Sequence, residues 1–358
     1  MIAGGGTGGH VSPGLAVAKV WTARHGAASV LWAGRRDSIE ERMARAAGLG
    51  FSPLEARPFK RSLDPQNLLL PLALGRGLGQ AWRLLKDFKP AAVLVTGGFV
   101  SVPVAFASVL RNRPLVLIEP NAVLGMSNRF FSGAAEAVCV AYPMAHPVRH
   151  MVLTGNPVRF KSRLPAAAEA RHKFGLGAKD PVLLVLPGSG AAHSINLALG
   201  GALKNLKNIQ LLWMTGALDH ADALKAAKGA KIKVVALPFI DDVPSAYAAC
   251  DLVLARCGAS MLAEIALAAK PSLLVPYPFA TGDHQRLNAL GFSEAGAGRM
   301  ILDGELDAER LANEVSTLIS DEAQLKRMAQ AARKLGKADA AENVAGVLDR
   351  VAKGFKYV

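Results

Sequence analysis

The chain is predicted to fold as an α/β protein built from two doubly wound parallel-sheet domains that face a shared cleft. Short apolar runs alternate with longer helix-like segments along all 358 residues, which is the pattern of parallel sheets covered by helices. The succession of strand, glycine turn and helix recurs near residues 4–10, 96–101 and 187–192. Because a single core rarely grows past about 250–300 residues, the length and this repeat together indicate two similar halves.

Most of the expected strands are unbroken apolar runs, as in strands that are covered on both faces. In chain order they are residues 28–33, 91–96, 115–118, 137–140, 182–186, 209–214, 233–237, 252–255 and 272–275. Helical patterns lie between them, for example at residues 38–47, 78–86, 196–203, 243–249 and 306–318. The link between the halves is expected at Gly155-Asn156-Pro157-Val158-Arg159, because a residue that precedes proline disfavours helical backbone. Ligands of such sheets bind beyond the carboxyl ends of the strands.

The composition narrows the class of protein. No run of about 18 uncharged apolar residues is present, so no transmembrane helix is expected. The N-terminus leads straight into a glycine-rich loop, so no secretory signal is expected either. Cys139, Cys250 and Cys257 lack the spacing of disulfides or zinc sites, which suits core residues in a reducing cytoplasm. The net charge of +14 indicates an anionic partner, such as nucleic acid, anionic phospholipid or a polyphosphate substrate. Signatures of nucleic-acid binding are lacking, and aromatic residues make up only 6%.

The densest chemical signal is the run Gly4-Gly5-Gly6-Thr7-Gly8-Gly9-His10. Glycine leaves backbone N–H groups uncovered, and such a loop at the start of a helix can bind phosphate. The run is not a P-loop, since no Gly-Lys-Ser/Thr closes it. It is not a dinucleotide fingerprint either, because Arg35-Arg36 stand where an acidic residue is required. A tight structural turn remains the alternative for the loop, and helix capping remains the alternative for His10.

Further glycine turns follow later strands. Gly97-Gly98-Phe99-Val100-Ser101 would lie beside the first loop, and two such turns suit a pyrophosphate better than a single phosphate. Gly188-Ser189-Gly190 is a weaker example in the second half. The segment from Arg256 to Glu264 enters a helix through small residues, which leave N–H groups free for a phosphate. Glu264 could accept both hydroxyls of a ribose, and a solvated helix glutamate is the alternative.

Three segments leave alternatives open. Residues 283–288, Asp-His-Gln-Arg-Leu-Asn, suit either the recognition of sugar hydroxyls or a solvated loop. Asp241-Asp242 would bind a metal or, more simply, begin the next helix, and no catalytic metal is expected because no Asp-x-Asp or His/Cys cluster is present. Residues 66–89 place leucines and Trp82 beside cations, with Lys60 and Arg61 just before them. This pattern fits an anionic phospholipid surface or a buried helix with a basic outer face.

The ordered set of motifs resembles the MurG family of glycosyltransferases over essentially the whole chain. It comprises residues 5–16, 97–101, 119–121 (Glu-Pro-Asn), 155–159 and 256–264. The resemblance implies the GT-B fold, with Rossmann-like domains at residues 1–157 for the acceptor and 158–340 for the donor, and a C-terminal helix (about 341–358) that packs back on the first. It implies transfer of N-acetylglucosamine from UDP-N-acetylglucosamine to undecaprenyl-pyrophosphoryl-N-acetylmuramoyl-pentapeptide, without metal or cofactor.

The resemblance further implies a peripheral protein on the cytoplasmic face of the bacterial inner membrane, active in peptidoglycan synthesis and so in cell shape and division. The acceptor would bind at Gly5, Gly6, Thr7, Gly8, Gly9, His10, Gly97, Gly98, Ser101 and Asn121. UDP-N-acetylglucosamine would bind at Thr7, Gly8, Gly9, Asn121, Arg159, Ser189, Phe239, Ile240, Gly258, Ala259, Ser260, Glu264, Gln285 and Asn288. Within that set Phe239 and Ile240 lie by the uracil, Glu264 takes the ribose hydroxyls, and Gln285 and Asn288 contact the sugar.

His10 is the predicted general base, because the ordinary pKa of histidine, about 6.5, suits proton transfer at neutral pH. Glu119 is the next candidate. Another GT-B enzyme, such as a glycolipid synthase or a UDP-sugar epimerase, would keep Glu264 and use a different acceptor. A nicotinamide-dependent oxidoreductase should carry an acid where Arg35-Arg36 stand. A basic nucleic-acid-binding protein should bind DNA or RNA with steep salt dependence.

Overall fold

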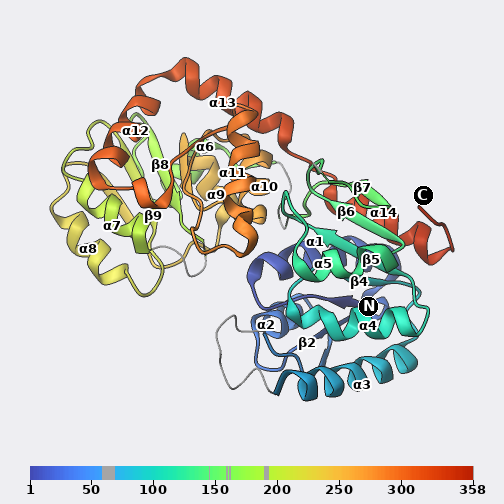
Figure 1. Ribbon diagram of the computed structural model, residues 1–358. Helices are drawn as coiled ribbons and strands as arrows, with labels where there is room; N and C mark the ends of the chain where they lie inside the picture. The colour runs from blue at the N-terminus through green and yellow to red at the C-terminus, as the bar shows by residue number, and fades with distance from the viewer. Residues whose placement is uncertain (59–68, 145, 159, 161–162, 189–192, 358) are drawn as a thin grey trace. The chain divides into compact units, whose positions relative to one another are not determined.

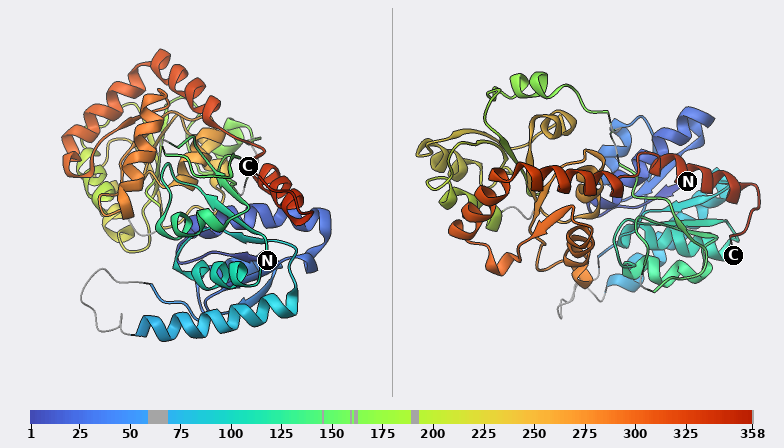
Figure 2. Two further views of the ribbon diagram at one scale, coloured as in Figure 1. Left: turned by 45° about the vertical axis from the view of Figure 1, so that its right-hand side comes forward. Right: turned by 90° about the horizontal axis from the view of Figure 1, so that it is seen from above.

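The computed structural model describes residues 1–58, 69–144, 146–158, 160, 163–188 and 193–357. The chain divides into two compact units. Unit 1 comprises Met1–Arg159 and Asp339–Val358, and unit 2 comprises Phe160–Ala338. Each unit is a parallel sheet between layers of helices, as Figures 1 and 2 show. The predicted α/β class with parallel sheets is confirmed.

Unit 1 contains a seven-stranded sheet in the order β3-β2-β1-β4-β5-β6-β7. The strands are β1 (Ile2–Ala3), β2 (Leu31–Gly34), β3 (Gly50–Pro53), β4 (Val93–Val95), β5 (Leu115–Glu119), β6 (Ala137–Val140) and β7 (Met151–Leu153). All neighbouring strands pair in parallel. The strand order reverses between β1 and β4, so the crevice beyond their carboxyl ends is the expected ligand site.

The helices of unit 1 are α1 (Gly8–His25), α2 (Ile39–Ala46), α3 (Leu70–Phe88), α4 (Val102–Leu110), α5 (Met126–Phe131) and α14 (Ala340–Ala352). On one face of the sheet, α1 and α14 share a core with Leu94, Val116 and Ile118. On the other face, α3 and α4 share a core with the alternate strand residues Val95 and Leu117. Residues from near the C-terminus therefore complete the core that the N-terminus begins.

Unit 2 contains a six-stranded parallel sheet in the order β10-β9-β8-β11-β12-β13. The strands are β8 (Val182–Leu186), β9 (Gln210–Met214), β10 (Lys233–Leu237), β11 (Leu252–Ala255), β12 (Ser272–Leu274) and β13 (Gly298–Met300). The helices are α6 (Ala167–Lys173), α7 (His193–Ala202), α8 (His220–Lys228), α9 (Val243–Ala249), α10 (Ala259–Leu267), α11 (His284–Glu294), α12 (Ala308–Ser320) and α13 (Glu322–Leu335). Here the order reverses between β8 and β11, so the turns after these two strands form the expected site.

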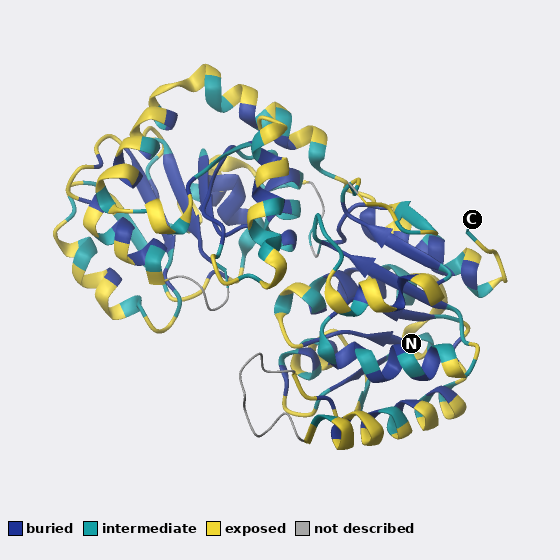
Figure 3. Cartoon of the chain, in the orientation of Figure 1, coloured by how far each residue is buried: buried dark blue, intermediate teal, exposed yellow. Residues whose placement is uncertain are grey.

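All nine predicted strands are present to within a few residues, and four strands were not predicted. Three of these four, β3, β7 and β13, lie at sheet edges, and the fourth, β1, has only two residues. Figure 3 shows that the strands of both sheets are largely buried. Buried strands are continuous apolar runs, which is why most of them could be predicted from the sequence. Edge strands such as Gly50–Pro53 are half-exposed and lack the continuous apolar run.

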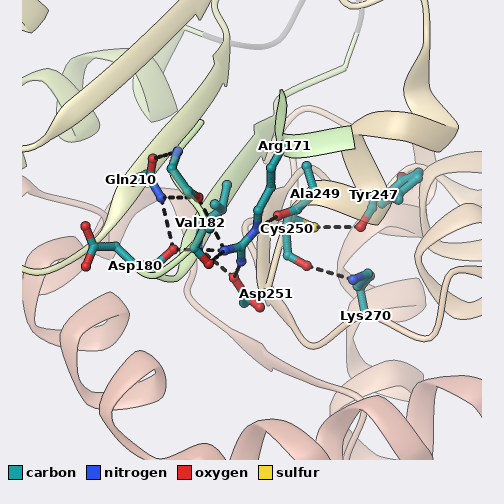
Figure 4. A network of polar contacts seen from close by, with 11 residues as sticks. Arg171, Asp180, Val182, Gln210, Tyr247, Ala249, Cys250, Asp251 and Lys270 are labelled. Atoms are coloured by element: carbon teal, nitrogen blue, oxygen red, sulfur yellow. Dashed lines mark hydrogen bonds and ion pairs between the residues drawn. The ribbon is translucent and has the colours of Figure 1, made fainter. Parts of the chain in front are cut away.

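A polar network at the amino ends of β8 and β11 fixes the base of unit 2 (Figure 4). Arg171 of α6 donates to Ala249 O at 3.1 Å and forms an ion pair with Asp251 at 2.7 Å. The same Asp251 oxygen accepts from Val182 N at 2.7 Å, so this carboxylate joins helix α6 to the first residue of β8. Lys270 Nζ donates to Cys250 O at 2.7 Å. Burial raises the pKa of the Cys250 thiol to about 12, which makes it an inert core residue, as predicted.

Helix α3 carries apolar side chains on an exposed face. Its buried stripe consists of small residues and one leucine, namely Ala73, Gly77, Ala81 and Leu85. Leu72 and Trp82 lie on the exposed side, where Arg76, Arg83 and Lys86 are also exposed. Lys60 and Arg61 lie outside the described residues. Within the described ranges, no helix has both the length and the apolar character required to span a bilayer.

Candidate active site

The two glycine turns of unit 1 lie in contact at the reversal point of its sheet. Gly5 follows β1 and Gly98 follows β4, and a Cβ added at Gly98 would lie 2.4 Å from Gly5 O. Gly6, Gly97 and Gly98 have positive φ angles of 84°, 95° and 80°, which glycine adopts at little cost. The close approach and these backbone angles require glycine at both turns. Thr7, Gly8 and Gly9 open helix α1, so its first N–H groups point towards the same place.

His10 lies in the first turn of α1 and contacts Thr96, the residue that follows β4. Its Nδ1 lies 3.2 Å from Thr96 O, and the Thr96 hydroxyl donates to His10 O at 2.6 Å. A carbonyl oxygen only accepts, so Nδ1 carries the proton in this contact, and in the neutral imidazole Nε2 is then the nitrogen that can accept a proton. A Cβ at Gly97 would come within 3.0 Å of His10 Nδ1. The second glycine turn therefore packs directly on the histidine.

Glu119, at the end of β5, is the centre of a buried hydrogen-bond cluster. Its Oε1 accepts from Asn121 N at 3.1 Å and from Asn121 Nδ2 at 2.9 Å. Its Oε2 accepts from Gly125 N at 2.7 Å and from Asn128 Nδ2 at 2.9 Å. Four donors on a carboxylate that is only 2% exposed favour a structural role. Asn121 is thereby placed by Glu119, and the loop at residues 120–125 is fixed.

Ser101 and Glu40 shape the site from beneath. Ser101 has no exposed surface and donates to Gly98 O at 2.8 Å, so it supports the second glycine turn. Its contact with the acceptor stays a prediction. Glu40, which the sequence analysis missed, is fully buried in the first turn of α2. Its carboxylate accepts from Gly6 N and from Arg35 N, each at 3.3 Å. The sequence gives only a glutamate in the first turn of a helix as an indication. The glycines that leave room for it are Gly5 and Gly34, and Gly5 is close to it in space but not in sequence.

In unit 2, the turn from β11 enters α10 through small residues. Gly258 is the N-cap residue of α10 and uses no side chain to cap it, and Ala259 begins the helix. The Ser260 hydroxyl is buried and has no hydrogen-bond partner among the described residues. A buried unpaired hydroxyl in the first turn of a helix is suited to a phosphate oxygen. Ser189, the predicted partner from the turn after β8, lies outside the described residues, as does Arg159.

Arg256 locks this turn to its neighbours. Its guanidinium forms an ion pair with Asp303 at 2.5 Å and donates to the Ser194 hydroxyl at 2.7 Å. It also donates to Val275 O and Pro276 O, both at 3.2 Å. The side chain is buried, so it joins the ends of β11, β12 and β13 to the start of α7 and fixes the turn that follows it.

Glu264 lies in the second turn of α10 and has a buried tyrosine behind it. The Tyr247 hydroxyl of α9 lies 3.5 Å from Glu264 Oε2 and 3.2 Å from Met261 Sδ. Burial, together with the charge of Glu264, raises the pKa of Tyr247 well above its ordinary range. The tyrosine therefore stays protonated at neutral pH and can donate to the carboxylate.

The side chains predicted to contact the sugar, Gln285 and Asn288, form hydrogen bonds with backbone groups. Gln285 Oε1 accepts from Cys257 N and from Tyr277 N, each at 3.1 Å. Asn288 is buried, and its amide donates to Cys257 O at 3.2 Å. These groups hold the β11 and β12 turns together. The carbonyl oxygen of Cys257 therefore competes with a sugar hydroxyl for the Asn288 Nδ2 donor.

The two residues predicted to lie by the uracil differ in exposure, and the Asp241-Asp242 pair lies at the start of a helix. Phe239 is 65% exposed after β10, whereas Ile240 is 2% exposed and lies in the core. The uracil contacts of both residues stay predictions. Asp242 is the N-cap of α9 and accepts from Ser245 N at 3.2 Å, which confirms the helix-start interpretation. Its hydrogen bond with Lys173 lowers its pKa. Among the described residues, no group of His, Cys, Asp and Glu could hold a metal.

Comparison with known proteins identifies the class. Residues 1–140 match the glycosyltransferase family 28 N-terminal domain, and residues 182–344 match the glycosyltransferase family 28 C-terminal domain. The solved glycotransferase of kitacinnamycin, 16% identical, aligns with a TM-score of 0.73 over 98% of this chain and 97% of that one, which shows the fold alone. With two Rossmann-like units and these domains, the chain is a glycosyltransferase of the GT-B fold.

The relatives narrow the class to one family. Proteins from Alkalilimnicola ehrlichii (40% identical over 352 residues, 97% of each chain) and Desulforudis audaxviator (37% over 365 residues, 98% of each) are both described as UDP-N-acetylglucosamine–N-acetylmuramyl-(pentapeptide) pyrophosphoryl-undecaprenol N-acetylglucosamine transferases. The crystal structure of Acinetobacter baumannii MurG, 27% identical, aligns with a TM-score of 0.80 over 98% of each chain. The chain belongs to the MurG family.

Proposed function

We propose that this chain transfers N-acetylglucosamine from UDP-N-acetylglucosamine to the 4-hydroxyl of undecaprenyl-pyrophosphoryl-N-acetylmuramoyl-pentapeptide. The observation that carries the proposal is the near full-length identity of 37–40% to relatives described by that reaction. The product would enter peptidoglycan synthesis, and through it cell shape and cell division. The proposed reaction uses no cofactor.

The acceptor is assigned to unit 1 and the donor to unit 2. The turns at residues 5–9 and 97–98 would hold the acceptor pyrophosphate, because the two turns are in contact and helix α1 begins there. Gly258, Ala259 and Ser260 would meet the donor diphosphate, with Ser189 and Arg159 as further predicted contacts. Glu264 would accept the ribose hydroxyls, and Phe239 would lie by the uracil. Contacts of Thr7, Gly8, Gly9 and Asn121 with the donor stay predictions, as does a sugar contact from Gln285 and Asn288.

The chemistry is an inverting displacement. The acceptor hydroxyl oxygen attacks the anomeric carbon from the face opposite UDP, the bond from that carbon to the diphosphate oxygen breaks, and a β-linkage forms. His10 Nε2 would take the hydroxyl proton, since Nδ1–H is directed at Thr96 O. The leaving diphosphate gains charge, which the N–H groups and the dipole at the start of α10 would stabilise.

Membrane association is assigned to the exposed face of α3. Leu72 and Trp82 would enter the interfacial region while Arg76, Arg83 and Lys86 meet anionic headgroups. Such a surface would place the enzyme peripherally on the cytoplasmic face of the inner membrane, where its lipid-linked acceptor is. A role in binding nucleic acid is not part of this proposal.

The direct test is release of UDP by the purified protein. With UDP-N-acetylglucosamine and a short-chain lipid-linked muramoyl-pentapeptide, we expect UDP release that equals the disaccharide product formed. Without the acceptor, release should fall to background. Release that needs a diacylglycerol acceptor would favour a glycolipid synthase, and interconversion of the free UDP-sugar would favour an epimerase. Either result would overturn the proposal.

Replacing Glu264 with glutamine should weaken UDP binding about tenfold, because hydrogen bonds to a charged group contribute about 1.5–3 kcal/mol. The same change should affect 2′-deoxy-UDP far less, since that ligand lacks one of the two hydroxyls that Glu264 would accept. Isothermal titration of both nucleotides measures the difference. Glu294→Gln, at an exposed position on α11, is the matched control. Equal losses for UDP and 2′-deoxy-UDP would rule out the ribose contact.

A further inference from the structure

Two arginines beside the acceptor site have no part in the mechanism above. Arg35 and Arg36 directly follow Gly34, the last residue of β2. Strand β2 pairs with β1, and β1 pairs with β4. Because the strands are parallel, their carboxyl ends meet at one edge of the sheet. The arginine pair therefore follows the strand next to the one that carries the glycine loop.

The Arg35 side chain and the glycine loop pack on the same aromatic ring. Its guanidinium carbon lies 5.4 Å from the centroid of the Phe99 ring, within the range of a cation–π contact. The edge of the same ring packs on the loop, since a Cβ added at Gly6 would lie 3.0 Å from Phe99 Cε1. One ring thus touches both groups. Gly6 and Thr7, on the loop that the ring contacts, are exposed.

The backbones of the two segments are joined by a buried carboxylate. Glu40 accepts from Gly6 N through Oε2 and from Arg35 N through Oε1, each at 3.3 Å. A negative charge beneath an anion site repels the ligand that the site would bind. A cation on the open side of the loop offsets this repulsion, and Arg35 supplies one from the segment that Glu40 itself holds.

The charge of Arg35 is not used within the described part of the chain. Arg35 forms no ion pair there, and its Nε is buried without a hydrogen-bond partner. Two other arginines that stack on rings differ from it. Arg45, over Phe51, pairs with Glu41, and Arg256, over Tyr277, pairs with Asp303. An unpaired guanidinium that a ring holds in place is pre-organised for an anion with several oxygens.

We propose that Arg35 binds the diphosphate of the lipid-linked acceptor, as a further substrate-binding residue of the site on unit 1. This inference rests on the proposed function, which supplies the diphosphate. The guanidinium would contact phosphate oxygens through its terminal N–H groups while the glycine-loop N–H groups contact others. Phe99 would act as the platform that sets the plane of the guanidinium, and Glu40 would keep Arg35 and Gly6 in register.

The test compares Arg35→Gln with Arg45→Gln. Both substitutions remove one positive charge from a ring-stacked arginine in unit 1, and of these two arginines only Arg35 stacks on the ring that packs on the glycine loop. For Arg35→Gln we expect the KM for the lipid-linked acceptor to rise at least tenfold, with the Kd for UDP unchanged. Arg35→Lys should recover part of the loss, because it keeps the charge without the planar fork. Inorganic pyrophosphate should inhibit competitively with the acceptor, and its inhibition constant should rise in Arg35→Gln.

Other sources of phosphate are separated by two further measurements. An equal weakening of UDP binding would assign Arg35 to the donor diphosphate, and lost sedimentation with phosphatidylglycerol vesicles would assign it to phospholipid headgroups. Either result overturns the inference, as does an acceptor KM within twofold of the unmodified enzyme or an equal rise in Arg45→Gln. If the unmodified enzyme fails to glycosylate the muramoyl acceptor, the proposed function fails instead. Thermal unfolding of each variant confirms that it is folded.

Discussion

Replacing His10 with alanine is expected to lower kcat by about 10²- to 10⁴-fold, the range that a positioned general base contributes. The acid limb of the pH–rate profile should disappear, because protonation of this imidazole would no longer switch off the base. The Kd for UDP should stay the same, since His10 belongs to unit 1 and the donor is assigned to unit 2. Steady-state rates across pH and titration with UDP measure these quantities.

Two variants separate the base from its surroundings. His10→Asn can still donate to Thr96 O, so it keeps the contact that orients the residue while offering no base. It should be nearly as inactive as His10→Ala. His25→Ala removes a histidine from the other end of the same helix, where it pairs with Asp349, and should keep full turnover. A His10→Asn enzyme with near-normal kcat would exclude His10 as the base.

Replacing Glu119 with glutamine is expected to lower kcat by about 10²-fold through misplacement of a loop, an effect that a shift of about 1 Å can produce. Glutamine would present an amide NH₂ to two of the four donors that now meet the carboxylate. Asn121 and the loop to Gly125 would then move. Because His10 is retained, the acid limb of the pH–rate profile should stay in place.

This last measurement decides the role of Glu119. Loss of the acid limb in Glu119→Gln, with its retention in His10→Asn, would make Glu119 the base after all. Glu136→Gln is the control, at a partly exposed glutamate in the same unit. Calorimetry should also show a lower stability for Glu119→Gln, since buried donors that lose their acceptor cost about 1–3 kcal/mol each.

The parts of the site that could be predicted from sequence are those carried by the backbone. Positive φ angles or close contacts require glycine at four positions of the turns, namely Gly5, Gly6, Gly97 and Gly98. Because only glycine meets either requirement at little cost, both are visible in the sequence. The order of apolar runs then places these turns after parallel strands. Their position at one sheet edge follows from topology alone.

Side-chain direction could not be predicted in the same way. The sugar contacts of Gln285 and Asn288 stay predictions, and the sequence did not indicate that both side chains bond to backbone groups of Cys257, 28 and 31 positions earlier. Glu40 was missed because its partner Gly6 is 34 residues away. Such contacts depend on which turns meet in space, and a local pattern of residue types does not report this.

The return of α14 to the first unit bears on how the protein is made. Val344, Val347 and Val351 are buried in the core built by α1 and the central strands, so this core stays incomplete until residues 339–358 have left the ribosome. Unit 2 is one uninterrupted stretch of chain and can finish folding earlier. The amino-terminal half, although synthesised first, is therefore the last to close during translation, and its unfinished apolar face is the surface that needs protection from aggregation.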